Sequence, residues 1–205
     1  ISAASFHAQF SNNVSIYAYS TTMVLNFENA QFADAQDLVI DLNIAESGKA
    51  PTVNLAGADF TGAEGVEIET HGAGGDWTSA TFDNVQFSRF KVGTQYTEPD
   101  KVTLMDGTSF TGAQFPESPS NCKFNQVEML NVSFANAVMA AEGVTIVNTT
   151  FDGVSFVDAT MSGLSLAAMD LTATSLAGAT MTGVDLSFAD LTGLDLTGTD
   201  LSQAT

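Results

Sequence analysis

The sequence predicts a repeat solenoid, a fold in which short units stack along one axis, and three observations support this prediction. Large apolar residues recur every five positions from residue 144 to the end, in twelve pentads without a break. A small or moderately apolar residue precedes each of them by two positions. A period of five matches neither the period of an amphipathic helix, near 3.6, nor that of a half-buried strand, which is 2. The large residues of the repeat are Ile146, Phe151, Phe156, Met161, Leu166, Leu171, Leu176, Met181, Leu186, Leu191, Leu196 and Leu201.

The pentads between residues 183 and 202 show the repeat most clearly. They read GVDLS, FADLT, GLDLT and GTDLS. This pattern resembles the pentapeptide-repeat family, whose unit has a small residue, a polar residue, Leu or Phe, and then two polar or small residues. The resemblance implies an all-β fold: a right-handed, four-sided parallel β-helix with four pentads in each coil. The Leu or Phe and the small residue then point inward.

If four pentads form a coil, residues about 20 apart stack in columns along the axis. The spacing between equivalent large residues reaches 28 before residue 134, so the earlier coils carry insertions of up to about eight residues. The whole chain then makes about eight to nine coils. We expect a first inward column of Phe27, Leu55, Phe82, Phe110, Phe134, Phe156, Leu176 and Leu196. We expect a second of Phe32, Phe60, Phe87, Phe115, Met139, Met161, Met181 and Leu201.

One corner of each coil carries residues suited to a tight turn. Only Gly, Asn and Asp occur there, the residue types that tolerate a positive φ or bond to their own backbone. We therefore expect left-handed backbone at this corner. Its residues are Asn29, Gly57, Asn84, Gly112, Asn136, Asp158, Gly178 and Gly198.

The repeat divides one continuous domain into three stretches. Residues 1–26 form an irregular N-terminal coil or cap, residues 27–143 form β-helix coils with inserted loops, and residues 144–205 form regular pentapeptide coils. The insertions lie at about 41–51, 69–76, 94–101, 116–121 and 140–143, on the third and fourth sides, and shorten along the chain. Loops on a rigid scaffold are frequent places for partner contacts, although tolerated drift gives the same pattern.

Composition limits the function classes. The chain has 24 Asp and Glu against 5 Lys and Arg, a formal net charge of −19, which argues against direct binding of nucleic acid or an anionic membrane. Its 44% hydrophobic residues are enough for a core. No apolar stretch reaches 18 residues, so no transmembrane helix is expected. A single Cys excludes an intrachain disulfide framework and a multi-cysteine zinc site.

No catalytic constellation is visible, so we predict that the chain is not an enzyme, with no cofactor and no metal. The only histidines are His7 and His71. Cys122, two before Phe124, is expected to point inward as a small buried residue instead of a reactive thiol. Trp77 is expected in the core, as are the methionines of the second column, because Met packs adaptably. A weak metal site at His71 with its loop carboxylates is less favoured than a solvated histidine.

Two sets of surface residues are candidates for protein binding. The loop set is Glu46, Lys49, Glu69, His71, Asp76, Tyr96, Glu98, Asp100 and Lys101. The acidic set is expected to line one long side of the rod, where it would attract a basic partner or cations, or serve solubility and prevent aggregation. Its members are Glu28, Asp34, Asp59, Asp83, Asp158, Asp195 and Asp200.

These features favour a non-enzymatic structural or interaction subunit of a larger complex. We expect it to dock through its loop face, its acidic side or an exposed coil end. End-to-end stacking is one form of assembly that the exposed coil end allows. The resemblance and the acidity suggest a thylakoid lumen, a periplasm or the outside of a cell, and a first residue, Ile1, that is not Met fits a processed chain. A cytoplasmic location is the alternative. The alternative function, implied by the resemblance, is an acidic DNA mimic that binds a type II topoisomerase, DNA gyrase.

Overall fold

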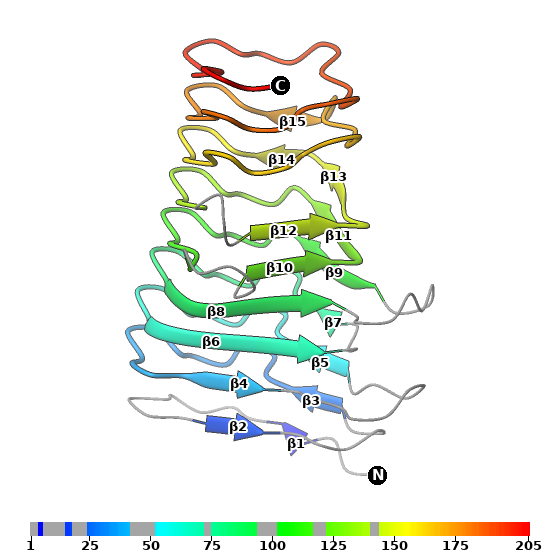
Figure 1. The fold of residues 1–205 in the computed structure, drawn as a ribbon. Helices are drawn as coiled ribbons and strands as arrows, with labels where there is room; N and C mark the ends of the chain where they lie inside the picture. The colour runs from blue at the N-terminus through cyan, green and yellow to red at the C-terminus, as the bar shows by residue number, and fades with distance from the viewer. Residues whose placement is uncertain are drawn as a thin grey trace.

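The chain forms a rod of stacked coils in the computed structural model, which describes residues 4–5, 15–17, 24–41, 52–71, 75–93, 102–116, 122–139 and 144–205. Strand β2 lies near one end of the rod, and β15 and the last residues lie near the other (Figure 1). Within the described ranges there is no helix, and hence none that could span a membrane. The predicted all-β solenoid is confirmed.

Two parallel sheets form two sides of the rod. Each strand pairs with the equivalent strand of the next coil, as Phe90 pairs with Cys122. The seven-stranded sheet consists of β1 (Ala4–Ser5), β3 (Val24–Asn26), β5 (Thr52–Asn54), β7 (Gly75–Asp76), β9 (Thr103–Asp106), β11 (Val127–Leu130) and β13 (Thr150–Asp152). The six-stranded sheet consists of β2 (Ser15–Tyr17), β4 (Val39–Asp41), β6 (Glu64–His71), β8 (Gln86–Gly93), β10 (Cys122–Asn125) and β12 (Val144–Val147). A short pair, β14 (Val154–Ser155) with β15 (Thr174–Ser175), lies beyond them.

The other two sides are columns of single parallel bridges, so each coil has the four sides that the resemblance implies. One column is Gln31, Asp59, Thr81, Ser109, Ser133 and Ser155. The next is Gln36, Glu64, Gln86, Gln114, Val138, Thr160, Thr180 and Asp200. The longest sheet has seven strands, fewer than the eight to nine coils expected. The last coils do not add strands to it, because they pair through isolated bridges such as Asp170 with Asp190.

The aromatic core corrects the predicted register of the first coils. Phe60 stacks on Phe32 below it and on Phe82 above it, with ring centroids 4.5 and 4.6 Å apart. Phe82 was expected above Leu55 and is not there, because the coil between Phe60 and Phe82 contains only 22 residues. The predicted columns assumed that these first coils have nearly equal lengths, whereas the lengths vary from one coil to the next. The predicted shortening of the insertions along the chain is therefore not regular.

From Phe82 onward the predicted columns are confirmed. Stacked rings continue through Phe110 and Phe134 to Phe156, with centroids 4.9 to 5.2 Å apart. The side chains of Met139, Met161 and Met181 are fully buried. Trp77 is also buried, and its ring lies 5.6 Å from that of Phe82. The inward residues thus form continuous apolar columns, in which each coil completes the burial of its neighbours.

The corners confirm the predicted backbone. All eight residues named for the tight corner have a positive φ, between 56° and 74°, although they belong to two neighbouring corner columns instead of one. Several glycines at these corners lie directly above an Asn or Asp of the preceding coil. A Cβ on Gly57 would lie 2.5 Å from Oδ1 of Asn29, and a Cβ on Gly112 would lie 2.5 Å from Oδ1 of Asn84. Glycine therefore satisfies both the left-handed backbone and the close approach of the lower side chain.

Candidate functional site

The shape of one corner changes between two consecutive coils. Between β12 and β13 the chain bends at Asn148, which has a φ of 50°. One coil later the equivalent corner is a β-turn at Ala167 and Ala168, closed by a 3.3 Å hydrogen bond from Met169 N to Leu166 O. The two coils therefore turn this corner with different backbone shapes. The two large sheets end at β12 and β13, immediately before this change of shape.

The backbone ladder is interrupted at the same place. No backbone hydrogen bond joins residues 144–153 to residues 164–173, all of which the structure describes. One coil further along, Leu166 N donates to Asp185 O at 2.8 Å and Leu171 N donates to Asp190 O at 3.0 Å. Their counterparts Ile146 and Phe151 have no such bond to the next coil. The upper edges of β12 and β13 are therefore open inside the stack.

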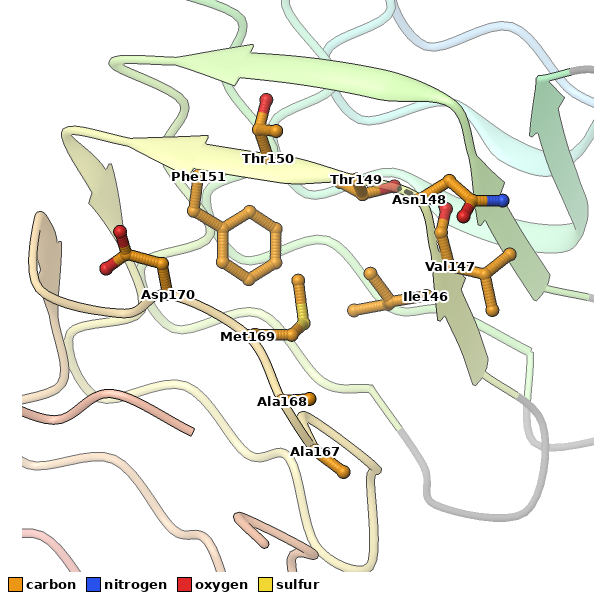
Figure 2. Close-up of a pocket in the computed structure, with 10 residues that line it drawn as sticks. All are labelled: Ile146, Val147, Asn148, Thr149, Thr150, Phe151, Ala167, Ala168, Met169 and Asp170. Atoms are coloured by element: carbon orange, nitrogen blue, oxygen red, sulfur yellow. Dashed lines mark hydrogen bonds between the residues drawn. The ribbon is translucent and has the colours of Figure 1, made fainter. Parts of the chain in front are cut away.

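A cleft of about 660 Å³ opens at this interruption. Residues 146–151 form one wall and residues 167–170 form the other. Figure 2 shows the side chains of Ile146, Phe151 and Met169 directed toward one another between the walls, whereas Asn148 points away. Val147, at the rim, is 38% exposed. The cleft thus combines an apolar floor with exposed polar groups along its mouth.

An exposed aromatic ring stands at the same corner, one coil beyond the cleft. Ala168 N donates to Ser187 O at 2.8 Å, which places Phe188 in the column of Ala168. The Phe188 side chain is 95% exposed, and its backbone has a φ of 62°. A left-handed backbone at a bulky residue costs about 1–2 kcal/mol. The position therefore combines conformational strain with a large apolar surface in water.

Carboxylates surround one end of the cleft. Asp170 lines it and pairs in register with Asp190 of the next coil. Glu128 pairs in register with Thr150 one coil before the cleft. At the opposite end, Lys123 pairs in register with Thr145. The cleft is therefore acidic at its β13 end, and its nearest described cation in the ladder lies below the β12 end.

Hydroxyl groups and backbone N–H groups stabilise the ionised form of several carboxylates of the last coils. Thr172 donates to Oδ1 of Asp170 from its hydroxyl at 2.7 Å and from its backbone N at 3.0 Å. These bonds lower the pKa of Asp170, and partial loss of hydration and the neighbouring charge of Asp190 oppose that change. The pKa of Asp185, Asp190, Asp195 and Asp200 is lowered in the same way by the Ser or Thr two residues later. Of these carboxylates, Asp170 and Asp190 lie at the β13 end of the cleft.

Comparison with known proteins identifies the repeat. Residues 165–203 match the family model for pentapeptide repeats in eight copies. The chain carries pentapeptide repeats. The match begins where the tight turns replace β12 and β13, so the cleft lies at the boundary between the pentapeptide coils and the strand-rich coils before them. No curated protein matches the chain.

Solved pentapeptide-repeat structures are similar at low identity. A trypsin-treated variant of QnrB1, a plasmid-mediated fluoroquinolone resistance protein, is 14% identical over 96% of this chain and 81% of its own, with a TM-score of 0.43. HetL, a pentapeptide repeat protein involved in heterocyst differentiation regulation from the cyanobacterium Nostoc sp. strain PCC 7120, is 16% identical over 96% and 89%, with a TM-score of 0.25. The parallel strand pairing of the chain itself establishes the fold.

The structure separates the predicted loop residues. Glu69 was expected in a loop, and this is wrong: it lies in β6, 9% exposed, with Oε1 3.0 Å from Arg89 Nε and 3.1 Å from Lys91 Nζ. His71 and Asp76 were expected in the same loop and also lie in strands, His71 at the end of β6 and Asp76, exposed, in β7. Residues 69–71 continue strand β6, which spans eight residues and is therefore longer than one pentad. Outside the described residues lie Glu46, Lys49, Tyr96, Glu98, Asp100 and Lys101.

The acidic set spreads over more than one side of the pentapeptide rod. Asp34 and Asp158 share a corner column, Asp59 and Asp195 lie on the side that follows sheet β1–β13, and Asp200 lies on the next side. Glu28 is exposed at a corner, and Asp83 is half-buried at another. Several of these carboxylates also brace the backbone, as Asp59 Oδ1 accepts from Thr61 N at 2.9 Å. Their role in partner binding stays a prediction.

The single cysteine of the chain is buried. Cys122 lies inward, as predicted, and burial raises the pKa of its thiol. Among the described residues no group of three or more His, Cys, Asp and Glu is placed to hold a metal ion. The cleft and Phe188 were not among the predicted sites. A signal was present, because Phe188 occupies the pentad position where Gly183, Gly193 and Gly198 stand.

Proposed function

We propose that the chain is a non-enzymatic protein-interaction subunit that docks on a partner through the face formed by the cleft and Phe188. The observation that carries the proposal is the exposed, left-handed Phe188. Corner positions of this kind hold Gly, Asn or Asp in most other coils. A phenylalanine there destabilises the free protein, and its exposed ring is the type of side chain that contributes strongly at protein interfaces when it is covered.

The cleft supports the same face. Its apolar floor and the ring of Phe188 lie at one corner of successive coils, so a single partner surface can contact both. The rigid stacked core behind them keeps this geometry fixed before binding, which lowers the entropic cost of docking. The open backbone edges offer hydrogen bonds to the same partner.

Partner capture with matched variants tests the proposal. The wild-type chain and Phe188→Asn are immobilised and exposed to a lysate of the source organism, with Phe188→Tyr as the conservative control. We expect one retained protein with the wild type and Phe188→Tyr, and its loss with Phe188→Asn at unchanged or higher thermal stability. Equal retention by all three chains would contradict the proposal.

The charge distribution favours a second candidate, an acidic DNA mimic that binds DNA gyrase. The described cations Arg89, Lys91 and Lys123 all lie on the six-stranded side. On the other three sides the described charged residues are acidic. A supercoiling assay tests this candidate, since a DNA mimic must inhibit or protect gyrase. No effect at micromolar protein would exclude it.

The location of the chain in a thylakoid lumen, a periplasm or the extracellular space stays a prediction. Fractionation of source cells followed by immunoblotting tests it, and signal confined to the cytosol would exclude export.

A further inference from the structure

We infer that the cleft binds a peptide segment of the partner, which follows the corner at Asn148, pairs in extended form with the open edges of β12 and β13 on either side of it, and places a basic residue at the Asp170 end. This inference rests on the proposed function and specifies the kind of segment that the docking face recognises.

The backbone of the cleft is the first reason. Residues 144–153 and 164–173 face each other without backbone hydrogen bonds, although the coils before and after are joined by regular ladders. An open strand edge presents donors and acceptors at the spacing of a β-ladder, and a strand from another chain satisfies them. Small apolar ligands cannot make these bonds. The interruption therefore favours a peptide backbone over a lipid or a hydrophobic metabolite.

The side chains of the cleft fit alternate residues of such a strand. Ile146, Phe151 and Met169 supply the apolar floor, and Thr149 and Thr150 stand at the mouth. Successive residues of an extended peptide point to opposite faces, so every second side chain enters the cleft and the others stay in water. A volume of about 660 Å³ lies within the range of about 300–1,000 Å³ that is common for ligand sites, which is enough for a short segment.

Charge complementarity selects a basic segment and its orientation. The chain carries a formal net charge of −19, and the β13 end of the cleft has Asp170, with Asp190 and Asp152 beside it. Asp170 Oδ1 accepts hydrogen bonds from the hydroxyl and the backbone N of Thr172, which stabilise its ionised form. At the β12 end, Lys123 lies one coil below and Asp185 pairs in register with Ser165 one coil above, so that end is less acidic than the β13 end. A Lys or Arg of the bound segment therefore lies at the β13 end.

A displayed heptapeptide library, panned against the full chain, provides the probe. We expect enriched sequences in which β-branched or aromatic residues alternate with polar ones and which contain Lys or Arg toward one end. Methylation of alternate backbone nitrogens on the pairing edge of a synthetic hit should weaken binding by about tenfold or more, because each methyl group removes a hydrogen bond. Methylation of the other edge serves as the control. No enrichment, or equal weakening from both edges, would overturn the inference.

Blocking the cleft provides a second, independent readout. Ala168→Cys places a thiol at the mouth of the cleft, and a bulky maleimide attached there should abolish binding of the peptide. The matched control is Ser79→Cys, an exposed corner residue with a φ of 56° on a distant coil. The buried Cys122 does not compete for the reagent. Peptide binding that survives the label on Ala168→Cys would place the peptide elsewhere and overturn the inference.

The two proposals fail in different ways. Peptide binding to the cleft together with partner capture that ignores Phe188→Asn would refute the proposed role of Phe188 alone. If partner capture depends on Phe188 but no peptide binds in the cleft, the added strand is refuted and the proposed docking face at Phe188 stands.

Discussion

The ring of Phe60 stacks on the ring of Phe82, with centroids 4.6 Å apart and planes inclined by 15°. This contact fixes the register of the rod, because it shows that the coil between the two residues is shorter than its neighbours. The same column continues upward through Phe110, whose centroid lies 4.9 Å from that of Phe82. Phe82 therefore has a stacked ring on each side.

Replacing Phe82 should be far more costly than replacing Phe188. Phe82→Leu removes two stacked ring contacts, each worth about 0.5–1.5 kcal/mol beyond the buried area, so the free energy of unfolding should fall by about 1–3 kcal/mol. Phe188→Leu makes the same chemical change at an exposed position and should change it by less than about 0.5 kcal/mol. Urea unfolding followed by circular dichroism measures both. Similar losses for the two variants would contradict the assigned stacking.

Two glycine substitutions separate backbone strain from steric contact. In Gly112→Ala the added Cβ would lie 2.5 Å from Oδ1 of Asn84, at a backbone φ of 68°. In Gly193→Ala the backbone φ is 79°, and the added Cβ would have no atom within 4 Å. A left-handed alanine alone costs about 1 kcal/mol or somewhat more. Gly112→Ala should therefore lower the free energy of unfolding more than Gly193→Ala does. Equal losses in chemical denaturation would show that the lower Asn side chain moves aside freely.

The pKa of Asp170 should depend on the hydroxyl of Thr172. Thr172→Val removes the largest cause of the lowered pKa, so that pKa should rise toward its usual value. Because the folded-state pKa is lowered, this bond stabilises the protein fully above about pH 4 and loses its effect as the pH falls through the folded-state pKa. Carboxyl-carbon NMR titration measures the change. Thr160→Val is the control, and an unchanged Asp170 in Thr172→Val would refute the assignment.

Amide exchange should reveal the interrupted ladder directly. Ile146 and Phe151 lack the upward hydrogen bonds that Leu166 and Leu171 make to Asp185 and Asp190. Their amide hydrogens should exchange about tenfold faster or more, since one lost hydrogen bond is worth roughly 1 kcal/mol or slightly more. Hydrogen–deuterium exchange by NMR in the free chain compares the two pairs. Equal protection would mean that the coils pair at this corner.

Local residue chemistry made the corners and the core types predictable. Gly178 and Asp158 adopt the left-handed backbone that their residue types allow, and Met161 and Trp77 are buried as their spacing indicated. The site was less predictable. The sequence shows Phe188 at a position where neighbouring pentads have glycine, but its exposure depends on the corner that it occupies in the fold. Glu69 was wrongly placed in a loop because strand β6 extends beyond one pentad.

By itself, the sequence determined that the chain winds into coils, because a period of five residues aligns Leu, Phe and Met in one direction and leaves Asp, Thr and Gly at the turns. Only the tertiary structure decided which coil lies on which, since insertions of unequal length shift the register without changing the local pattern. It also decided where the ladder opens. Whether the bend at Asn148 matches the turn at Ala168 is a property of two coils in contact, and neither segment carries it alone.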